Sequence, residues 1–543
     1  MSSRHVLLLF FLVTFFGQTV QADDPVHMWS KRFGEIGGAN QVVTDVALDA
    51  SDNIVFAGYF EGVVDFGGGP LVSAGESDIF VAKFDRFGSH VWSGRFGDTM
   101  EQPSGGLDVT VDSDGNVILA GAFEGAVDFD GGRLESGGGS DVFIAKFDPV
   151  GSHLWSACFG DSVHQYGTAV ACDSSGNSYL VGDFTGTLNF GGDTFTSESG
   201  WDWFDVKFDP QGNHVWSHAS SGSDLNKLYA KDVAIDSNGG VVIVGIARWW
   251  AGSLGLGLGQ MIVRRLFPNG THDESFFYGE EFLMFDEEKD EAHAVATGAL
   301  GSFVLTGIYA DTNVFFGKWD NSCDLVWSHT YGSWGTIANG IAIDSTGNMV
   351  IVGNLGIDGV NFGGGYLPEP GTFAVKIDSS GNHLWSEVFS GHYLNGCWDV
   401  AVNASGDFVI GGGFSNSIDF GGGPLVSAGG QDAFLAKFAS SPTGIEKDPA
   451  RRSLGLAARP NPFNMSTTIS FTMSERARVT LTIYDVQGKM VRTLVSDDDI
   501  GEGYQERTWD GRDDRNNPVS SGVYFYKIMC GNYMLTKKLV LLN

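Results

Sequence analysis

The sequence is poor in cysteine and in positive charge. Its five cysteines, Cys158, Cys172, Cys323, Cys397 and Cys530, are sparse and odd in number, and no two have the CxxC spacing. A disulfide framework or a zinc site is therefore not expected, and buried free thiols are the simpler interpretation. Lys and Arg number 32 against 66 Asp and Glu, which gives a formal charge of −34. Such an acidic surface repels phosphate backbones and argues against nucleic acid as a partner.

Long apolar runs are also lacking, apart from a short one at the N-terminus. Arg4 precedes the apolar stretch 6–16, and Val20-Gln21-Ala22 places small residues where a signal peptidase reads them. This pattern predicts a signal peptide over 1–22, cleaved after Ala22, and a secreted or cell-surface location. No later segment reaches the length needed to cross a bilayer, so no transmembrane span is expected in the mature chain.

Helical periodicity and catalytic signatures are missing as well. Short apolar runs bounded by Gly, Asp, Asn and Ser dominate the chain, and Gly alone accounts for 78 residues. This pattern is typical of strands joined by tight turns, so the chain is predicted to be all-β. Because HExxH, GxSxG, P-loop and catalytic-cysteine motifs do not occur, we expect a protein that is not an enzyme. No cofactor is expected, with calcium left as an open alternative.

What the sequence does contain is an internal repeat. A turn followed by an aromatic strand recurs as FDRFGSHVWS (84–93), FDPVGSHLWS (147–156), FDPQGNHVWS (208–217) and IDSSGNHLWS (377–386). Its tryptophans are Trp29, Trp92, Trp155, Trp216, Trp327 and Trp385, and a degenerate copy at 269–279 has Glu274 in that place. The intervals of 53 to 63 residues indicate an array of supersecondary units. Since Glu274 cannot replace the Trp, the fourth and fifth units are predicted to be the least stable.

The number of strands in the repeat predicts a closed ring. Seven first strands start near Asp45, Asp108, Thr168, Asp232, Ala292, Gly340 and Asp399. The last unit stops at Phe438 without a Trp strand, whereas the Trp strand at 27–30 has no unit before it. We therefore expect 27–30 to pair with 432–438 and to close a seven-bladed β-propeller over 23–438. An open solenoid would need capping repeats instead.

The repeat carries four markers: a DxxGN turn, a Gly-rich excursion such as DFGGG (65–69), an AKFD strand and a GxHxWS strand. With these markers, residues 27–438 resemble the bacterial seven-bladed propeller repeats known as SBBP repeats. The resemblance implies an exported binding or scaffold propeller and names no activity. A quinone-type oxidoreductase or a glycan-active enzyme is the alternative. The D-x-x-G-x-x-x-W segment resembles the tryptophan-docking motif of quinone dehydrogenases, but those enzymes usually have eight blades and adjacent cysteines.

A change of composition marks a second domain. A polar linker at 439–456 is followed by the motifs ARPNPFNMSTTISF (458–471), IYDVQGKMVRTL (483–494) and TWDGRDDRNNPVSSGVYFYKI (508–528). Residues 457–543 thus resemble the Ig-like domain of flagellar hook-capping proteins and the C-terminal sorting domain of type IX secretion substrates. The resemblance implies a small Ig-like β-sandwich and secretion machinery as a partner. A spacer or adhesion module is the alternative. The motif residues are Pro460, Asn461, Pro462, Tyr484, Asp485, Gly488, Trp509, Asp510, Gly511, Gly522 and Tyr524.

Two stretches outside the repeat pattern are candidate ligand sites of the propeller. Trp249 and Trp250 are expected in a loop of the fourth blade, where they would form a stacking platform for a sugar, so a glycan or a protein is the expected ligand. Packing is the alternative, because adjacent strand residues face opposite ways. Asp286, Glu287, Glu288 and Asp290 lie in the acidic stretch 279–293. They are candidate calcium ligands, and a solvated loop is the alternative.

Polar residues that recur in many units have a structural alternative. Asp65, Asp128 and Asp419 precede the Gly-rich excursions, and Asp78, Asp141 and Asp432 begin the third strands. Carboxylates beside glycine carbonyls suit calcium, but hydrogen bonds within the turns explain the same residues. A histidine stands two residues before the Trp in nearly every unit and is expected to be structural.

Overall fold

The computed structural model describes residues 25–542. The exceptions are residues 36, 101, 103–105, 198–199, 221–225, 252–255, 279–289, 310–312, 333, 368–369, 391–395, 441–456, 460, 462, 474–475, 486–488, 502 and 531–532. The chain divides into two compact units, Met1–Pro442 and Thr443–Asn543. Within the described ranges the only helical element is a single turn at Ala299–Gly301, so the all-β prediction is confirmed.

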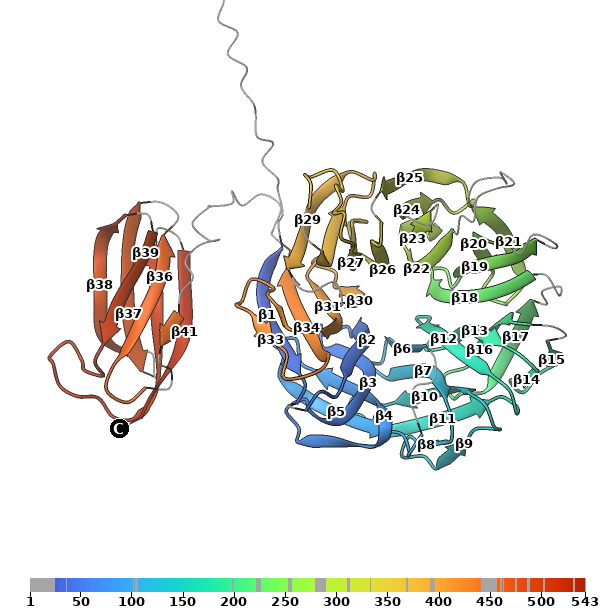
Figure 1. The fold of residues 1–543 in the computed structure, drawn as a ribbon, viewed down its shortest axis with the longest axis horizontal. Helices are drawn as coiled ribbons and strands as arrows, with labels where there is room; N and C mark the ends of the chain where they lie inside the picture. Colours follow the sequence, from blue (N-terminus) through green and yellow to red (C-terminus); the bar gives the residue numbers. More distant parts are fainter. Residues whose placement is uncertain are drawn as a thin grey trace, which may run out of the picture. The chain divides into compact units, whose positions relative to one another are not determined.

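The first unit is a ring of seven four-stranded antiparallel sheets (Figure 1), as the repeat predicts. In every blade the inner strand is nearest the ring axis, and the other strands follow outward in order. Blade one contains β2 (Gln41–Leu48), β3 (Ile54–Asp65), β4 (Pro70–Phe84) and β5 (His90–Phe96). Blade two contains β6 (Leu107–Val111), β7 (Val117–Phe123), β10 (Asp141–Phe147) and β11 (His153–Phe159). Blade three contains β12 (Gln165–Cys172), β13 (Ser178–Phe184), β16 (Asp202–Phe208) and β17 (His214–Ser220). Blade four contains β18 (Asn226–Ile235), β19 (Val241–Ala251), β20 (Leu256–Leu266) and β21 (His272–Tyr278).

The remaining blades follow the same order. Blade five contains β22 (Glu291–Thr297), β23 (Phe303–Tyr309), β24 (Asn313–Trp319) and β25 (Leu325–Gly332). Blade six contains β26 (Ile337–Ile343), β27 (Met349–Leu355), β28 (Gly371–Ile377) and β29 (His383–Ser390). Blade seven contains β30 (Gly396–Val402), β31 (Phe408–Phe414), β34 (Asp432–Ala439) and β1 (Val26–Phe33). Three Gly-rich excursions form two-stranded ribbons: β8 (Ala126–Asp128) with β9 (Arg133–Glu135), β14 (Thr187–Asn189) with β15 (Thr194–Thr196), and β32 (Ser417–Ile418) with β33 (Leu425–Val426).

The N-terminal strand closes the ring. Strand β1 is the outer strand of blade seven and runs antiparallel to β34, with Ser30 opposite Ala436 and Lys31 opposite Leu435. Arg32 adds an ion pair to the buried Asp432. The predicted pairing of 27–30 with 432–438 is therefore confirmed. Because the two strands are about 400 residues apart in sequence, closure links the two ends of the propeller directly.

The His and Gly of the repeat motifs depend on each other. In blade one the imidazole of His90 lies over the Gly-rich excursion, and a Cβ added at Gly68 would stand 2.3 Å from the His90 Cε1. The His90 Nε2 and the Ser93 Oγ are 3.0 Å apart. Equivalent His–Ser contacts occur at His153, His214, His272 and His383. The repeated histidines are thus structural, as expected, and glycine is needed because no side chain fits under the ring.

In five blades the Trp of the outer strand packs against a glycine turn of the next blade. A Cβ at Gly151 would lie 2.6 Å from the Trp92 Cδ2, and the Trp92 indole N–H donates to the Pro149 carbonyl at 3.2 Å. The buried apolar core also lies between blades. One cluster joins Val55 and Val81 of blade one to Leu119 and Phe143 of blade two.

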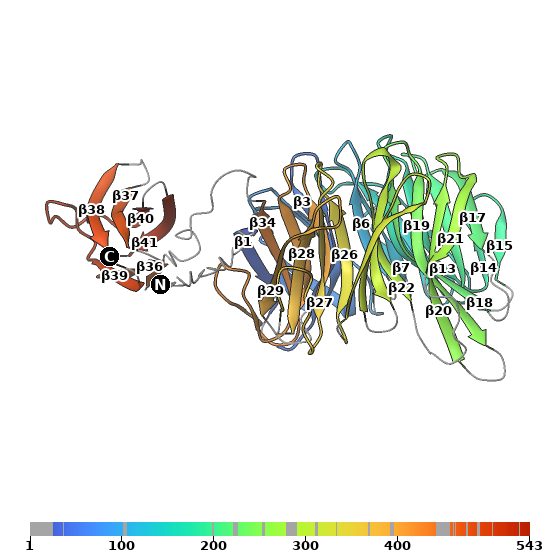
Figure 2. The same cartoon turned by 90° about the horizontal axis from the view of Figure 1, so that it is seen from above.

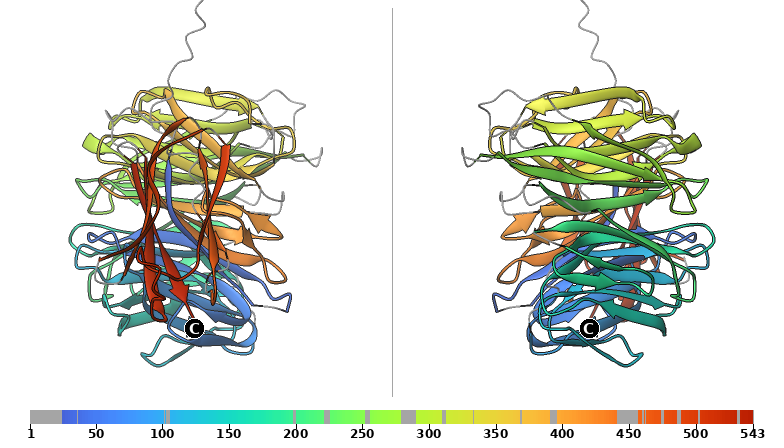
Figure 3. Two further views of the ribbon diagram at one scale, coloured as in Figure 1. Left: turned by 90° about the vertical axis from the view of Figure 1, so that its left-hand side faces the viewer. Right: turned by 90° about the vertical axis from the view of Figure 1, so that its right-hand side faces the viewer.

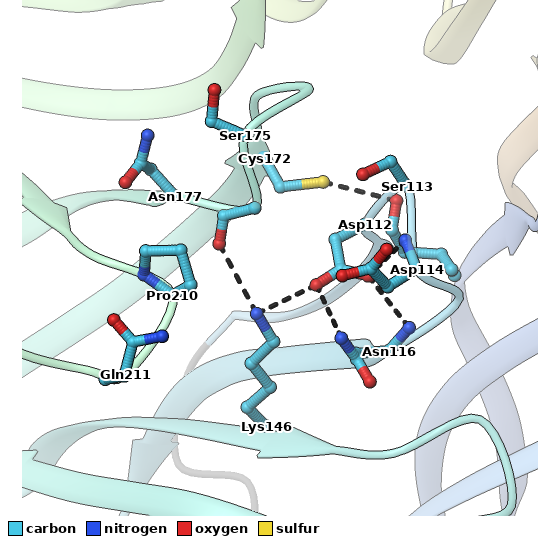
Figure 4. Close-up of polar contacts among 12 residues, drawn as sticks. Asp112, Ser113, Asp114, Asn116, Lys146, Cys172, Ser175, Asn177, Pro210 and Gln211 are labelled. Carbon is cyan, nitrogen blue, oxygen red and sulfur yellow. Dashed lines mark hydrogen bonds and ion pairs between the residues drawn. The ribbon is translucent and has the colours of Figure 1, made fainter.

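In five blades a buried cation of the third strand anchors the turn after the inner strand. The ammonium group of Lys146 lies 2.8 Å from the Asp112 Oδ2 and 3.3 Å from the Gly176 carbonyl of the next blade (Figure 4). Asp112 also accepts backbone N–H groups from Asp114 and Asn116. Although burial opposes ionisation, these bonds hold the pKa of Asp112 below its ordinary value. Equivalent ion pairs join Asp49 to Lys83, Asp173 to Lys207, Asp236 to Arg265 and Asp344 to Lys376.

The second unit is a small β-sandwich, drawn in red in Figures 1 and 3. One sheet contains β35 (Ala457–Arg459), β36 (Thr467–Met473) and β39 (Gly503–Trp509). The other has the order β38 (Met490–Ile500), β37 (Ala477–Asp485), β40 (Gly522–Cys530) and β41 (Tyr533–Leu541). Trp509 is fully buried between them, against Phe463 and Tyr524.

Candidate ligand site over blades three to five

The two faces of the propeller differ in the length of their connections. One face, which we call the turn face, carries the tight turns within blades. The opposite face, the loop face, carries the connections between blades and the strand ends from which the Gly-rich excursions start. Blade four projects furthest there, because β19 and β20 continue as a paired hairpin to Ala251 and Leu256 (Figure 2). The loop face is therefore where the blades differ from one another most.

Four neighbouring aromatic rings from blades three and four form a row on the loop face, which we call the aromatic row. The His164 and Tyr166 centroids are 6.0 Å apart, with an interplanar angle of 14°. Tyr166 and Trp201 are 5.3 Å apart at 17°, and Trp201 and Tyr229 are 6.5 Å apart at 34°. His164 is exposed and the other three are half-buried. The row therefore forms part of the accessible surface.

The strand ends position these rings. Tyr166 and Tyr229 stand near the starts of the inner strands β12 and β18, and Trp201 directly precedes β16. The Leu228 N–H donates to the Trp201 carbonyl at 3.4 Å, which links the inner strand of blade four to the residue before the third strand of blade three. Because all three positions lie at the same end of their strands, the topology brings together residues that are far apart in sequence.

An ionic network continues from the end of the row into blade five. The Arg248 guanidinium lies 5.6 Å from the Tyr229 ring centroid and donates to the Glu291 Oε1 at 2.7 Å. The His293 Nε2 lies 3.7 Å from Glu291, and its Nδ1 is 3.0 Å from the Ala338 carbonyl. His293 and, against the effect of burial, Arg248 lower the pKa of Glu291 to about 2. Glu291 is therefore ionised at all physiological pH values.

A buried carboxyl group lies close to Tyr229. Asp183 is 5% exposed, and its Oδ1 accepts the Ala230 N–H at 2.7 Å. Burial raises the pKa of Asp183 to about 8, although the Ala230 N–H and Lys231 oppose the shift. Burial also raises the pKa of Tyr229, with Asp183 adding to the shift and Arg248 opposing it. At neutral pH Asp183 is thus mostly protonated and adds little negative charge to the site.

Three exposed cations gather around the aromatic row: Lys227, Lys231 and Arg248. Lys227 lies beside Gly200, which directly precedes Trp201, since a Cβ there would be 3.8 Å from the Lys227 Cε. Lys231 interacts electrostatically with Asp183. Glu291 balances one of these cations. Lys227 and Lys231 are therefore exposed cations beside the row in a chain whose formal charge is −34.

The two predicted stacking tryptophans are in a strand, so their predicted placement in a loop is wrong. Trp249 and Trp250 belong to β19 and pair with Leu258 and Gly257 of β20. Gly-Leu alternation is compatible with a loop, whereas the second half of this run forms β20. The two residues directly follow Arg248, at the edge of the candidate site. Their role in binding a ligand stays a prediction.

The predicted calcium ligands are only partly described by the structure. Asp286, Glu287 and Glu288 lie outside the described residues. Asp290 is buried rather than solvated, and its N–H donates to the Gly259 carbonyl at 3.1 Å. Over the ranges that the structure describes, no three His, Cys, Asp or Glu side chains are grouped so that they could hold a metal ion. Calcium binding at 286–290 stays a prediction.

The repeated carboxylates have the roles that the turn alternative gives them. The Asp65 Oδ1 accepts the Gly67 and Gly69 N–H groups, and Asp419 does the same for Gly421 and Gly423. The Asp128 Oδ1 accepts the Gly132 N–H in the same way. At the third strands, Asp78 and Asp432 form ion pairs with Arg95 and Arg32. Asp141 has Cys158 at the equivalent position, and burial raises its pKa to about 6.

The described motif residues at the C-terminus hold the sandwich together. The Asn461 amide bonds to the Val540 N–H and the Lys538 carbonyl of β41. The Trp509 indole donates to the Arg512 carbonyl at 2.9 Å, and the Tyr524 hydroxyl to the Ser520 carbonyl at 2.6 Å.

The other motif residues are at turns and strand ends. The Asp485 Oδ1 accepts the Lys489 N–H, and Asp510 lies 3.5 Å from Arg492. Tyr484 pairs with Phe525, and Gly522 with Leu541. Gly511 has a φ of +67°. Pro460, Pro462 and Gly488 lie outside the described residues.

The sequence analysis missed the aromatic row. Its members come from three separate stretches and share no motif, so no local pattern marks them. The one available signal was an exception to the repeat: Tyr166 and Tyr229 hold the same repeat position in blades three and four, where blades one, five, six and seven have Val42, Glu291, Ile337 and Gly396.

Comparison with curated proteins gives two partial matches. A 199-residue segment is 27% identical to an uncharacterized WD repeat-containing protein, L264, of Acanthamoeba polyphaga mimivirus, covering 31% of this chain and 14% of that protein. A 158-residue segment is 31% identical to the regulatory protein FlaEY of Caulobacter vibrioides, covering 28% and 16%. The chain therefore spans less than a fifth of the length of these relatives.

Several solved structures are similar in outline. PorZ, a bacterial surface component of the type-IX secretion system of Porphyromonas gingivalis, has a TM-score of 0.32 and 13% identity, covering 92% of this chain and 81% of its own. The β-propeller domain of the Trilobed protease from Pyrococcus furiosus has a TM-score of 0.37 and 8% identity, covering 76% and 96%. No described helix is long and apolar enough to cross a membrane. In the C-terminal unit, residues 462–530 match the family described as the FlgD Ig-like domain.

Proposed function

We propose that this chain is an exported, non-enzymatic binding protein of the cell surface or the extracellular medium. The propeller holds a ligand on its loop face, and the Ig-like unit serves as a type IX-like sorting domain. The observation that carries the proposal is the aromatic row with its exposed cations. It joins blades three and four, and it has no role in closing the ring.

Export is supported by the N-terminal pattern and by the organisation of the chain. A signal peptide over 1–22 takes a chain across the inner membrane only, so delivery to the surface requires a second signal. The linker at 439–456 and the Ig-like unit at 457–543 offer one. Its four-stranded sheet has β38 and β41 as edge strands, and an edge strand can be recognised by strand addition.

An enzymatic function is the second candidate. Asp183 and Glu291, whose pKa values are about 8 and about 2, differ in the way that an acid and a base of a hydrolytic site do. The binding function is favoured because Asp183 is buried and bonded to a backbone N–H, so its proton does not face solvent. Product analysis after incubation with a ligand separates the two, since a binding protein releases the ligand unchanged.

Truncation and transfer together test the sorting role. In a host with type IX secretion, a chain lacking 457–543 should accumulate as a folded propeller in the periplasm. The same segment fused to an unrelated periplasmic protein should bring that protein to the surface. A matched control fusion carries Trp509→Ala, which removes the core of the sandwich. Surface display of the truncated chain, or periplasmic retention of the intact fusion, would leave the spacer alternative standing.

A further inference from the structure

We propose that the aromatic row, with Lys227, Lys231 and Arg248, is a binding site for an acidic polysaccharide. The inference deepens the proposed binding function, on which it rests, by naming the class of ligand. It depends on described residues only, and it concerns the loop face of blades three to five.

The rings supply an apolar surface that a hydrated chain can use. Four rings spaced 5.3 to 6.5 Å apart form a continuous strip that presents ring edges, since neighbouring rings cover one another's faces. Pyranose rings have apolar C–H groups that can lie in van der Waals contact with such edges, with hydroxyl groups directed outward. A strip of several rings suits a chain of repeating sugar units better than a single small molecule.

The charges determine which sugars fit. Lys227 and Lys231 are exposed, and the Arg248 side chain is 47% exposed although it pairs with Glu291. Asp183 is mostly protonated at neutral pH and offsets little of this charge. Aromatic edges are also electropositive. Carboxylate or sulfate groups on the ligand would therefore meet positive charge along the strip.

Glu291 favours a hydroxylated ligand over a simple polyanion. It stays ionised, and a carboxylate accepts hydrogen bonds from hydroxyl groups. A peptide of acidic residues has no hydroxyl groups at this density to donate to the carboxylate.

Single-stranded nucleic acid also combines charge with stacking, but it fits this surface less well. Bases need ring faces on which to stack, and the members of the row already face one another, with interplanar angles of 14° to 34°. A uronate or sulfated glycan needs no free ring face, because its C–H groups can contact the ring edges that the row exposes.

Affinity electrophoresis of the chain without residues 1–22 tests the proposal, with alginate as the uronate probe, heparin as the sulfated probe, dextran as the neutral probe and poly-glutamate as the peptide probe. At low salt, alginate or heparin should retard the protein, and dextran and poly-glutamate should not. Trp201→Ala should weaken the retention at least about tenfold. The double variant Lys227→Gln/Lys231→Gln should weaken it and reduce its salt dependence.

Matched controls lie elsewhere on the chain. Trp334→Ala removes another exposed tryptophan, and Lys489→Gln another exposed lysine, and both should bind as the parent does. Unfolding midpoints of all variants show whether the propeller stays folded. Failure of both alginate and heparin to bind, equal binding of dextran or poly-glutamate, or unchanged affinity of Trp201→Ala would each overturn the proposal. Surface display of the chain is measured separately, so export can succeed where this inference fails.

Discussion

Gly151 lies against the indole of Trp92 across the junction between blades one and two, where a Cβ would stand 2.6 Å from the Trp92 Cδ2. Gly88 and Gly212 have the same relationship to Trp29 and Trp155. The Gly and the Trp of the repeat are therefore one packing unit shared by neighbouring blades.

Gly151→Ala should destabilise the propeller more than Gly115→Ala. Both glycines have positive φ, +89° and +81°, so each alanine costs about 1–2 kcal/mol in backbone strain. At Gly115 the nearest side-chain atom, in Pro149, is 3.5 Å from the added Cβ, which is ordinary contact. The overlap with Trp92 should add about 1–3 kcal/mol at Gly151. Urea unfolding measures the difference, which should shrink when Trp92→Ala is added; equal losses for the two glycines would refute the packing argument.

The Lys146–Asp112 ion pair should respond asymmetrically to substitution. Both side chains are about 2% exposed, so Lys146→Met leaves an uncompensated carboxylate and should cost about 3–5 kcal/mol. Asp112→Asn should cost less, because Lys146 keeps its hydrogen bond to the Gly176 carbonyl. Blade seven also shows that asparagine fits this turn, since Asn403 occupies the same position and accepts the Asp407 N–H. Arg133→Met, in an exposed pair with Glu135, is the control at about 0–1 kcal/mol. A larger loss for Asp112→Asn than for Lys146→Met, measured by urea unfolding, would contradict this.

Stability should fall as pH rises through neutrality because of buried inner-strand carboxyls. Burial and, secondarily, Asp108 raise the pKa of Asp232 to about 8, whereas an unfolded Asp has a pKa of about 4. Between those values the folded state binds the extra proton, so the stability that this group contributes is complete below about pH 4 and is lost by about pH 8. Asp232→Asn cannot ionise and keeps an acceptor for the Val295 N–H.

The free energy of unfolding of Asp232→Asn, relative to that of the parent, should therefore rise by at least about 1.4 kcal/mol between pH 5 and pH 8. Urea unfolding at three pH values measures this. The control is Asp148→Asn, at a turn where N–H bonds from Ser152 and Val150 outweigh burial and lower the pKa. Its difference from the parent should stay constant over the same range. A constant difference for Asp232→Asn as well would show that its carboxyl is already ionised at pH 5.

Trp509→Ala should loosen the sandwich without affecting the propeller. Trp509 is fully buried in a core that contains no propeller residue, and its truncation should cost about 3–5 kcal/mol. Hydrogen exchange on the full chain should accelerate in β36, β37 and β40, with β7 and β13 unchanged. Faster exchange in the propeller strands would mean that the two units unfold together.

The ring was predictable from sequence, whereas the aromatic row was not. An orphan Trp strand at 27–30 and an incomplete last unit leave only one simple pairing, because a four-stranded blade needs its outer strand. Tyr166, Trp201 and Tyr229 carry no such constraint. They come together only because the starts of two inner strands and of one third strand meet at one face, and the length of each loop determines whether the rings touch. Trp249 and Trp250 were placed in a loop for a related reason, since Gly-Leu alternation fits both a loop and a strand.

The junction between blades four and five departs from the repeat at three positions at once. Glu274 stands opposite Arg265, where the other blades have Trp opposite Lys, and Cys323 with a φ of +60° replaces the turn glycine. Arg265 donates to both the backbone carbonyl and the side chain of Asn321 in the next blade. The Asn321 carbonyl corresponds to the Pro149 carbonyl, which accepts the Trp92 indole N–H in the junction of blades one and two. Arg265 therefore replaces the missing indole as the donor to this carbonyl. These bonds oppose the loss of the Trp packing, on which the prediction that blades four and five are the least stable part of the ring depends. Hydrogen exchange at 274–310, compared with blades one and two, tests that prediction.

The effects on stability of reversing these three departures should be non-additive. Arg265→Lys alone restores the residue of the other blades, yet it should destabilise the propeller by about 1–3 kcal/mol, since one ammonium group cannot replace the planar fork that binds Asn321 and Asp236. Glu274→Trp alone should also destabilise, because the Cys323 side chain occupies the space that glycine leaves in other junctions. The triple variant Arg265→Lys/Glu274→Trp/Cys323→Gly rebuilds the whole unit and should recover the parent's stability or exceed it. Urea unfolding of the singles and the triple measures the coupling; a triple variant whose loss equals the sum of the single losses would show that the three positions act independently.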